Sequence, residues 1–330
     1  MTLLRVETLA VELLRDGARY PLVKDASLEV APGETLAVVG ESGSGKSLTA
    51  LAVMGLLAPE LSIARGRVIF DGQDLGRLSP EQLREIRGRD MAMVFQEPMT
   101  SLNPVLSIGR QLTEGMRLKL GLSRREARER AASLLAEVGI ADPERRLSQF
   151  PHQFSGGMRQ RVMIAMALAC QPKLILADEP TTALDVTIQA QILALTARLC
   201  REHGVGLVLI THNLGIVARY ADRVSVMYAG HVVEEASAAD LYARPAHPYT
   251  RGLLDSVPRL DTERRTALKP IPGAPPDPMR PVTGCPFHPR CAHAGEICRT
   301  TMPPPVRAES RMVACHAPLE AVSKTMAVAS

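Results

Sequence analysis

Three short runs of apolar residues stand out in the first 240 positions of this 330-residue chain. They are TLAVVG at 35–40, LILADEP at 174–180 and GVGLVLITH at 204–212. Apolar runs of this length are typical of strands buried on both faces, and each is followed by a helical pattern. The alternation predicts an α/β core built on a largely parallel sheet.

The region between Pro104 and about Ala169 lacks strand signals. Its segment SRREARERAASLLAEVGI places Leu134, Leu135 and Val138 on one helical face, with arginines and glutamates on the opposite face. This pattern predicts a mostly helical insert.

The composition changes after about Ala243, since 15 of the 25 prolines lie between Pro245 and Pro318. Proline removes a backbone donor and fixes φ, so the pattern predicts neither regular sheet nor long helix there. Such a tail is either disordered or held by something other than a core. We therefore expect a main domain over 1–240 and a C-terminal extension over 241–330.

Composition narrows the class of protein. The chain is 46% apolar, enough for a core, and its formal charge is only +4 from 39 basic and 35 acidic residues. The sequence contains no long Lys/Arg run of the kind that indicates a nucleic-acid partner. Acidic residues interrupt the first apolar stretch, unlike a signal peptide, and no apolar run approaches the ~20 residues of a membrane span. These features predict a soluble, cytoplasmic protein, in which disulfides are disfavoured.

The segment GESGSGKS at Gly40–Ser47 matches the phosphate-loop pattern G-x-x-x-x-G-K-[ST] between a predicted strand and a predicted helix. The glycines let backbone N–H groups point at phosphate oxygens, and the helix N-terminus adds a positive dipole. Lys46 would contact the β- and γ-phosphates, and the Ser47 hydroxyl would bind Mg²⁺.

The run LILADEP supplies two carboxylates. It places Asp178 at the carboxyl end of a buried strand, where a carboxylate is costly unless it faces a cation such as Mg²⁺. Glu179 follows and points differently, which suits it to orient an attacking water. The guanine-reading N-K-x-D is absent. The two motifs predict a P-loop nucleotidase and leave small-molecule kinases open.

The segment FSGGMRQR at Phe154–Arg161 resembles the L-S-G-G-Q signature of the ABC-transporter ATPase family. Other family motifs follow in order. Tyr20 stands where the family has an adenine-stacking aromatic, Gln96 in MVFQEP matches the Q-loop, ALD at Ala183–Asp185 matches the D-loop, and His212 matches the switch histidine.

This resemblance implies a P-loop ABC-type nucleotide-binding domain: a RecA-like core sheet, an antiparallel β subdomain and a helical subdomain over about 98–165. It implies a head-to-tail dimer in which each signature closes over the ATP held by the partner's phosphate loop, and hydrolysis reopens the dimer. The implied catalytic residues are Glu179, His212 and Gln96, and the implied Mg²⁺ ligands are Ser47, Gln96 and Asp178. The implied ATP contacts are Tyr20, Gly40, Ser42, Gly43, Ser44, Gly45, Lys46, Ser47, Leu48, Asp178, Ser155, Gly156, Gly157, Met158 and Asp185.

Two positions depart from the family pattern. Leu48 stands where many relatives have Ser or Thr, so an α-phosphate contact there would come from the backbone alone. Phe154 replaces the usual leucine, which is ordinary in the subgroup described next. The catalytic set is otherwise complete, which argues against a non-catalytic regulatory cassette.

The segments VFQEPMTSLNPVLSIG at Val94–Gly109 and HPYTRGLL at His247–Leu254 resemble the dipeptide/oligopeptide subgroup of ABC importers. Met158 resembles the first of two paired ATPase types, which favours a heterodimer and leaves a homodimer open. The implied partners are two membrane-spanning permease subunits, a second ATPase and an extracytoplasmic solute-binding protein, at the cytoplasmic face of the membrane. Peptides are the expected solute, with glutathione or nickel complexes as alternatives. A soluble ABC protein acting on nucleic acid or ribosomes usually has two cassettes or a long coiled coil, and neither is evident.

Four of the six cysteines lie in the tail, as Cys285-x5-Cys291-x6-Cys298-x16-Cys315. Unrelated thiols, disulfides, a zinc site aided by histidines, and an iron–sulfur cluster are the alternatives. The gaps are wider than common zinc knuckles, and prolines stiffen a segment with too few apolar residues to fold unaided. The peptide-permease subgroup carries a similar C-P-[FYH]-x-x-R-C tail, matched here by CPFHPRC. The resemblance therefore favours a [4Fe–4S] cluster, with Zn²⁺ as the alternative, in a structural or redox-sensing role.

Overall fold

The structure, a computed structural model, describes residues 2–96, 101–181, 185–256, 270–280, 282–308 and 310–319. These residues form two compact units. The first comprises Met1–Leu4, Glu29–Thr35 and Ile69–Ile210, and the second comprises Arg5–Leu28, Leu36–Val68 and Thr211–Ser330. The phosphate loop falls in the second unit, and the predicted carboxylates and signature fall in the first.

The first unit is built on three parallel strands: β6 (Met91–Val94), β7 (Leu174–Asp178) and β8 (Gly206–Thr211). β7 pairs with β6 on one side and β8 on the other. Every residue of β7 and β8 is buried, as expected for continuous apolar runs covered on both faces. Both predicted strands are confirmed.

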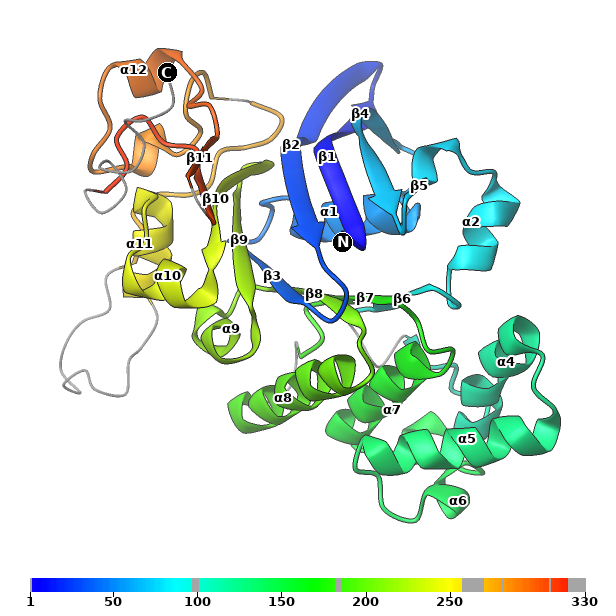
Figure 1. Ribbon diagram of the computed structural model, residues 1–330. Helices are drawn as coiled ribbons and strands as arrows, with labels where there is room; N and C mark the ends of the chain where they lie inside the picture. Colours follow the sequence, from blue (N-terminus) through cyan, green and yellow to red (C-terminus); the bar gives the residue numbers. More distant parts are fainter. Residues whose placement is uncertain are drawn as a thin grey trace. The chain divides into compact units, whose positions relative to one another are not determined.

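Helices make up most of the rest of the first unit (Figure 1). Leu134, Leu135 and Val138 are buried, and α5 packs against α4 and α7, so the predicted amphipathic helix is confirmed. Ser123 begins α5 with a capping box that satisfies two orphan backbone donors. The elements are β5 (Gln73–Asp74), η1 (Leu75–Arg77), α2 (Pro80–Ile86), α4 (Ile108–Leu120), α5 (Arg124–Glu137), α6 (Pro143–Arg146), η2 (Pro151–Gln153), α7 (Gly156–Leu168) and α8 (Val186–Glu202).

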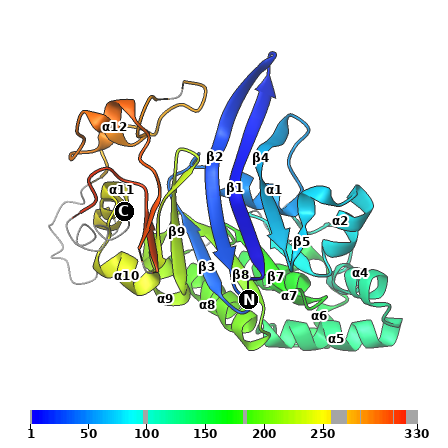
Figure 2. The same ribbon diagram turned by 45° about the horizontal axis from the view of Figure 1, so that its top comes forward.

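The second unit opens with two long strands, β1 (Leu4–Arg15) and β2 (Ala18–Val30), which run side by side in both ribbon views (Figures 1 and 2). Asp16 and Gly17 connect them, with φ of 51° and 75°. Positive φ at both central residues is typical of a tight hairpin turn, and Asp-Gly adopts it readily. β4 (Leu61–Phe70) lies on the other side of β1.

The second half of this unit is organised around β9 (Arg223–Tyr228). β9 pairs in parallel with β3 (Thr35–Val39) and antiparallel with β10 (His231–Ser237). β12 (Arg311–Val313) pairs with β10 on the opposite side from β9, and β11 (Val306–Ala308) pairs with β12. The helical elements are α1 (Lys46–Met54), α9 (Leu214–Tyr220), α10 (Ala238–Ala243), α11 (Pro248–Asp255), η3 (His288–Arg290) and α12 (Ile297–Thr300).

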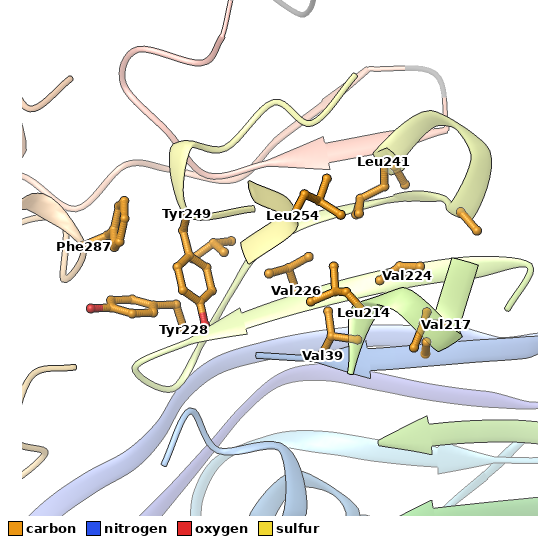
Figure 3. Close-up of a cluster of buried hydrophobic side chains, with 14 of the residues drawn as sticks. Val39, Leu214, Val217, Val224, Val226, Tyr228, Leu241, Tyr249, Leu254 and Phe287 are labelled. Carbon is orange, nitrogen blue, oxygen red and sulfur yellow. The ribbon is translucent and has the colours of Figure 1, made fainter. Parts of the chain in front are cut away.

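One hydrophobic cluster joins this sheet to the tail (Figure 3). Aliphatic side chains such as Val39, Val226 and Leu241 fill its middle, and Tyr228, Tyr249 and Phe287 close one end. Two sequence expectations for the tail are therefore wrong. Short strands do form there, and the tail is held partly by an apolar core that Phe287 enters.

The described residues contain no helix that is both long and apolar enough to cross a membrane.

Candidate functional site

The phosphate loop Gly40–Ser47 connects β3 to α1, in the predicted context of strand, loop and helix. A Cβ at Gly40 would lie 2.2 Å from the Met227 carbonyl oxygen, so only glycine fits there. Gly43 and Gly45 have φ of 77° and 102°, conformations that L side chains rarely adopt. The loop's shape therefore depends on its glycines.

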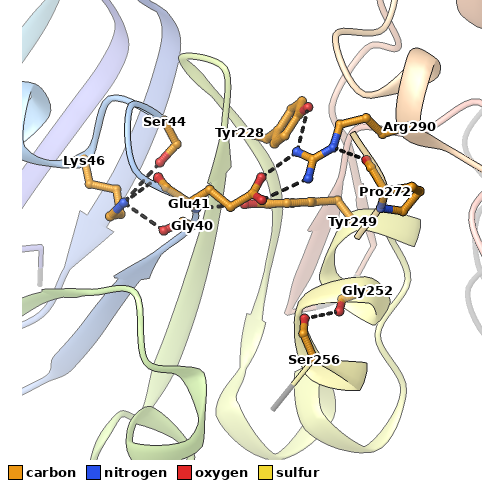
Figure 4. A network of polar contacts seen from close by, with 10 residues as sticks. All are labelled: Gly40, Glu41, Ser44, Lys46, Tyr228, Tyr249, Gly252, Ser256, Pro272 and Arg290. Atoms are coloured by element: carbon orange, nitrogen blue, oxygen red, sulfur yellow. Dashed lines mark hydrogen bonds and ion pairs between the residues drawn. The ribbon is translucent and has the colours of Figure 1, made fainter. Parts of the chain in front are cut away.

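The Lys46 side chain is buried, and its ammonium group lies against the inner surface of the loop (Figure 4). Its Nζ donates to the carbonyl oxygens of Gly40 and Glu41 at 2.8 and 2.9 Å, and to Ser44 Oγ at 3.3 Å. α1 begins at this lysine without a side-chain cap, since Gly45 precedes it. The positive N-terminal end of α1, next to a fixed ammonium, makes this loop suited to bind phosphate.

The second unit also holds the predicted adenine-stacking residue and the predicted switch residue. Tyr20 lies in β2 and is half-buried, and His212 follows β8 and is exposed. Asn213 N donates to Thr211 Oγ1 at 3.1 Å and turns the chain into α9 directly after His212. The histidine is therefore carried at a strand-to-helix connection, as the sequence suggested.

The predicted carboxylates lie at the end of β7 in the first unit. Asp178 is buried as the last residue of the strand, and Glu179 follows with φ of 43°. Positive φ is uncommon for a non-glycine residue, and it turns the Glu179 side chain out of the strand's alternation. Gln96 Nε2 donates to Glu179 Oε2 at 3.2 Å, so the Q-loop glutamine and the predicted base are in direct contact.

The predicted signature residues lie at the start of α7. Ser155 caps this helix by accepting from Met158 N at 3.3 Å, and Gly156 and Gly157 form its first turn. Ser155 and Gly156 are exposed, so the positive end of α7 faces solvent in this chain. Asp185 is exposed and caps α8 by accepting from Ile188 N at 2.9 Å. Ala183 and Leu184 of the predicted D-loop lie outside the described residues.

The four tail cysteines line one pocket, although they are spread over 31 positions. Cys285, Cys291, Cys298 and Cys315 line it together with Phe287 and His247. Burial raises the pKa of Cys285 and Cys291, and it raises the pKa of Cys315 to about 11. The thiols thus form a common apolar pocket that disfavours free thiolates.

A buried histidine lines the same pocket. His247 Nδ1 accepts from Tyr249 N at 3.0 Å, which places the ring proton on Nε2. Nε2 is buried without a hydrogen-bond partner, and burial lowers the pKa of His247 to about 3. Within the described residues no group of three or more His, Cys, Asp or Glu side chains is arranged to hold a metal ion. The pocket therefore offers thiols and a donor, without a preformed single-ion site.

Three hydrogen bonds between the phosphate loop and the tail were not anticipated from the sequence. Glu41 donates its backbone N–H to Tyr249 Oη, and its carboxylate accepts two hydrogen bonds from Arg290. The segments HPYTRGLL and CPFHPRC contain these partners. Nothing in either segment, however, indicates a residue more than 200 positions earlier.

The phosphate loop, the acidic strand end with its glutamine, and the helix-opening signature together define an ATP-binding cassette. The chain belongs to the ABC transporter ATPase family. The family described as ABC transporter matches residues 23–182, and the family described as oligopeptide/dipeptide transporter, C-terminal region, matches residues 233–298. The predicted family and the predicted α/β fold of an ABC-type nucleotide-binding domain are confirmed.

Relatives and solved structures agree with this assignment. The dipeptide transport ATP-binding protein DppD of Bacillus subtilis is 50% identical over 314 residues, covering 94% of this chain and 93% of that protein. The oligopeptide transport ATP-binding protein OppD of Salmonella typhimurium is 48% identical over 318 residues, covering 96% and 94%. The dimeric structure of a bacterial ABC transporter cassette superposes with a TM-score of 0.64 at 30% identity, covering 71% of this chain and 98% of that one.

Proposed function

We propose that this chain is the ATP-hydrolysing subunit that drives import of peptides through an ABC transporter. The proposal rests on the family assignment of the C-terminal tail. A C-terminal region of the oligopeptide/dipeptide transporter type follows an ABC cassette, and relatives that are 48–50% identical over nearly the whole chain are named for dipeptide and oligopeptide transport. Glutathione and nickel complexes are the alternative solutes for the same machinery.

The residues assigned to the ATP site have separate roles. Lys46 and the N–H groups of the loop bind the phosphates, and Ser47, Gln96 and Asp178 would hold Mg²⁺, which would offset the phosphate charge. Glu179 orients and polarises the attacking water, because its positive φ turns it away from Asp178 and its contact with Gln96 holds its carboxylate. His212 positions the γ-phosphate and Tyr20 stacks on adenine.

The signature acts on a second ATPase. Ser155, Gly156, Gly157 and Met158 offer an exposed helix N-terminus that binds the γ-phosphate held by a partner cassette, and Asp185 lies along that contact. ATP closes the dimer and hydrolysis reopens it. A second, different ATPase type is the favoured partner, and a second copy of this chain is the alternative. Two permease subunits and an extracytoplasmic solute-binding protein complete the transporter, at the cytoplasmic face of the cell membrane.

The assigned base is tested by Glu179→Gln. The amide keeps the shape and the hydrogen bond with Gln96 but cannot accept a proton, so ATP still binds, turnover stops, and the ATP-bound dimer persists. Turnover, nucleotide binding and dimer mass by light scattering are measured together. Glu137→Gln, on the surface of α5, is the matched control and keeps wild-type turnover. Near-normal turnover in the Glu179 variant would refute the base.

The peptide assignment is tested on the complete transporter. Proteins that co-purify with this chain from membranes are identified, and the solute on the binding protein is determined by mass spectrometry. Recovery of permeases with bound peptide supports the proposal. A bound metal complex or ribosomal partner, with no peptide, contradicts it.

The cysteine pocket is the proposed site of a [4Fe–4S] cluster with a structural or redox-sensing role. Two observations fit this group. Four thiols line one pocket, and the buried Nε2–H of His247 lines it without a partner, as a donor to cluster sulfur requires. Zn²⁺, held by the thiols with help from histidines of the same pocket, is the alternative.

Anaerobic purification tests the cluster. The proposal expects four iron and four sulfide per chain, with the broad visible absorbance of an iron–sulfur centre, and loss of both in a Cys298→Ser variant. Protein with neither iron nor this absorbance would exclude the cluster, and stoichiometric zinc would establish the alternative.

A further inference from the structure

Arg290 of the tail reaches the phosphate loop (Figure 4). Its Nη1 and Nη2 donate to the two carboxylate oxygens of Glu41 at 2.6 and 2.9 Å, across 249 positions of sequence. Its Nε donates to the carbonyl of Pro272 at 2.8 Å, and Nη1 also contacts Tyr228 Oη at 3.3 Å. The Arg290 side chain is only 4% exposed, so its contact with Glu41 is a bidentate ion pair whose guanidinium is buried.

Glu41, the second residue of the phosphate loop, is held at three groups. Its backbone N–H donates to Tyr249 Oη at 2.8 Å, and its carbonyl accepts from Lys46 Nζ at 2.9 Å. Arg290 holds the third group, the carboxylate. Two of the three contacts come from the segment after residue 245, and the third is the phosphate-binding lysine itself. A shift of Glu41 would therefore move an oxygen to which Lys46 is bonded.

The charge of Glu41 is unfavourable for the loop's purpose. A carboxylate in a loop that binds a polyanion repels the ligand. Arg290 places a positive charge directly on this carboxylate. The Glu41 carboxylate in turn raises the pKa of Arg290, so the guanidinium stays charged at every physiological pH.

The backbone around Arg290 is fixed by the cysteine segment. Arg290 ends the short helix η3, whose first N–H, at His288, donates to the Cys285 carbonyl, and the N–H of Cys291 donates to His288. The rings of Tyr228 and Phe287 lie 5.8 and 6.0 Å from the guanidinium carbon. The position of Arg290 is thus set by residues whose neighbours line the thiol pocket.

We propose that Arg290 is a positioning residue of the ATP site: it neutralises and fixes Glu41, so that the phosphate loop binds ATP at full affinity only when the tail is docked. The inference rests on the proposed role of the loop in binding ATP. It assigns the tail a part in nucleotide binding that the loop pattern alone does not indicate.

The test is a double-mutant cycle of Arg290 and Glu41 in the full-length chain, with the Kd for MgATP as the measured quantity. Arg290→Met leaves Glu41 as an unneutralised charge, and the Kd for MgATP rises about tenfold, with KM rising and kcat little changed. Adding Glu41→Gln removes the repulsive charge, and the Kd of the double variant returns to within about twofold of wild type. Arg299→Met is the matched control, since Arg299 is exposed and follows Cys298 as closely as Arg290 precedes Cys291; its Kd stays at the wild-type value.

Arg290→Lys carries the test independently if the methionine variant folds poorly. Lysine keeps the positive charge but cannot make the bidentate pair of hydrogen bonds with the carboxylate, so the Kd for MgATP rises about threefold, as expected for the loss of one hydrogen bond. A wild-type Kd in both Arg290 variants overturns the inference. A double variant as weak as Arg290→Met also overturns it, because the loss of affinity would then come from the arginine's other contacts, with Pro272 and Tyr228, and not from the charge of Glu41. Failure of the wild type to bind ATP would instead contradict the proposed function.

Discussion

Gly40 provides the most direct test of the phosphate loop's geometry. A Cβ at this position would lie 2.2 Å from the Met227 carbonyl oxygen and 2.9 Å from Ser44 Oγ, where ordinary contacts are 3.4–4 Å. The first clash is with backbone at the end of β9, so no side-chain rotation relieves it. The second disturbs the hydroxyl that Lys46 contacts.

The size of the effect follows from two terms. Shifting close-packed backbone to accept an extra methyl costs about 1–3 kcal/mol, and the unfavourable φ of 153° adds about 1–3 kcal/mol. Gly40→Ala should therefore lower the free energy of unfolding by about 4 kcal/mol. Gly43→Ala, in the same loop, has φ of 77° and nothing within 4 Å, so only the strain of about 1–2 kcal/mol applies.

The assay is urea unfolding of the nucleotide-free proteins, followed by far-ultraviolet circular dichroism, with midpoint and slope compared. Working without ATP separates the fold of the loop from its chemistry. Equal losses in the two variants, or a loss below about 1 kcal/mol for Gly40→Ala, would refute the backbone packing described for the loop.

Three further changes have defined outcomes. Phe287→Ala should cost about 3–4 kcal/mol, because the ring is buried against Tyr228 and Tyr249; a calorimetric loss below 1 kcal/mol would contradict docking of the tail through this core. Burial raises the pKa of Glu234, so the contribution of this group to stability is full below the unfolded-state pKa of 4.5 and falls as pH rises through the folded-state pKa. Glu234→Gln should lack this fall in stability. Identical pH profiles of the urea midpoint for the two proteins would contradict the assignment to Glu234. Ser155→Ala removes the cap of α7 and should cost about 1 kcal/mol, with faster amide exchange in its first turn; unchanged exchange would argue against the cap.

The main domain was readable from the sequence because its elements carry local signals. The runs at 35–40 and 174–180 became β3 and β7, since strands buried on both faces require continuous apolar residues. The phosphate loop, Asp178 and the signature at α7 each combine a residue pattern with a strand or helix boundary, so their local structure could be predicted. The contact of Gln96 with Glu179 joins positions 83 apart and was found only in the structure.

The tail was less predictable because its stabilising contacts are distant in sequence. Proline content correctly indicated the scarcity of long elements, but β12 forms by pairing Val313 with Glu234, which the composition does not show. Phe287 looked like one apolar residue in a polar segment, yet it completes a core made by β9 and α11. The pair of Arg290 with Glu41 leaves no periodic or motif signal in a single sequence.

The placement of β12 on β10 bears on how peptide-type tails can be exchanged between ATPases. β10 uses both of its edges, one for β9 and the other for β2 at His231 and for β12 at Glu234 and Glu235. The buried Glu234 carboxyl group accepts from the N–H groups of Ala246 and His247. A chain cut near residue 240 would leave the β12-binding part of this edge bare and the buried carboxyl group unpaired, and both favour aggregation or unfolding. The tail therefore cannot be transferred to another ATPase by itself. A chimaera would have to include β10, and with it the end of the cassette sheet, to give a soluble protein.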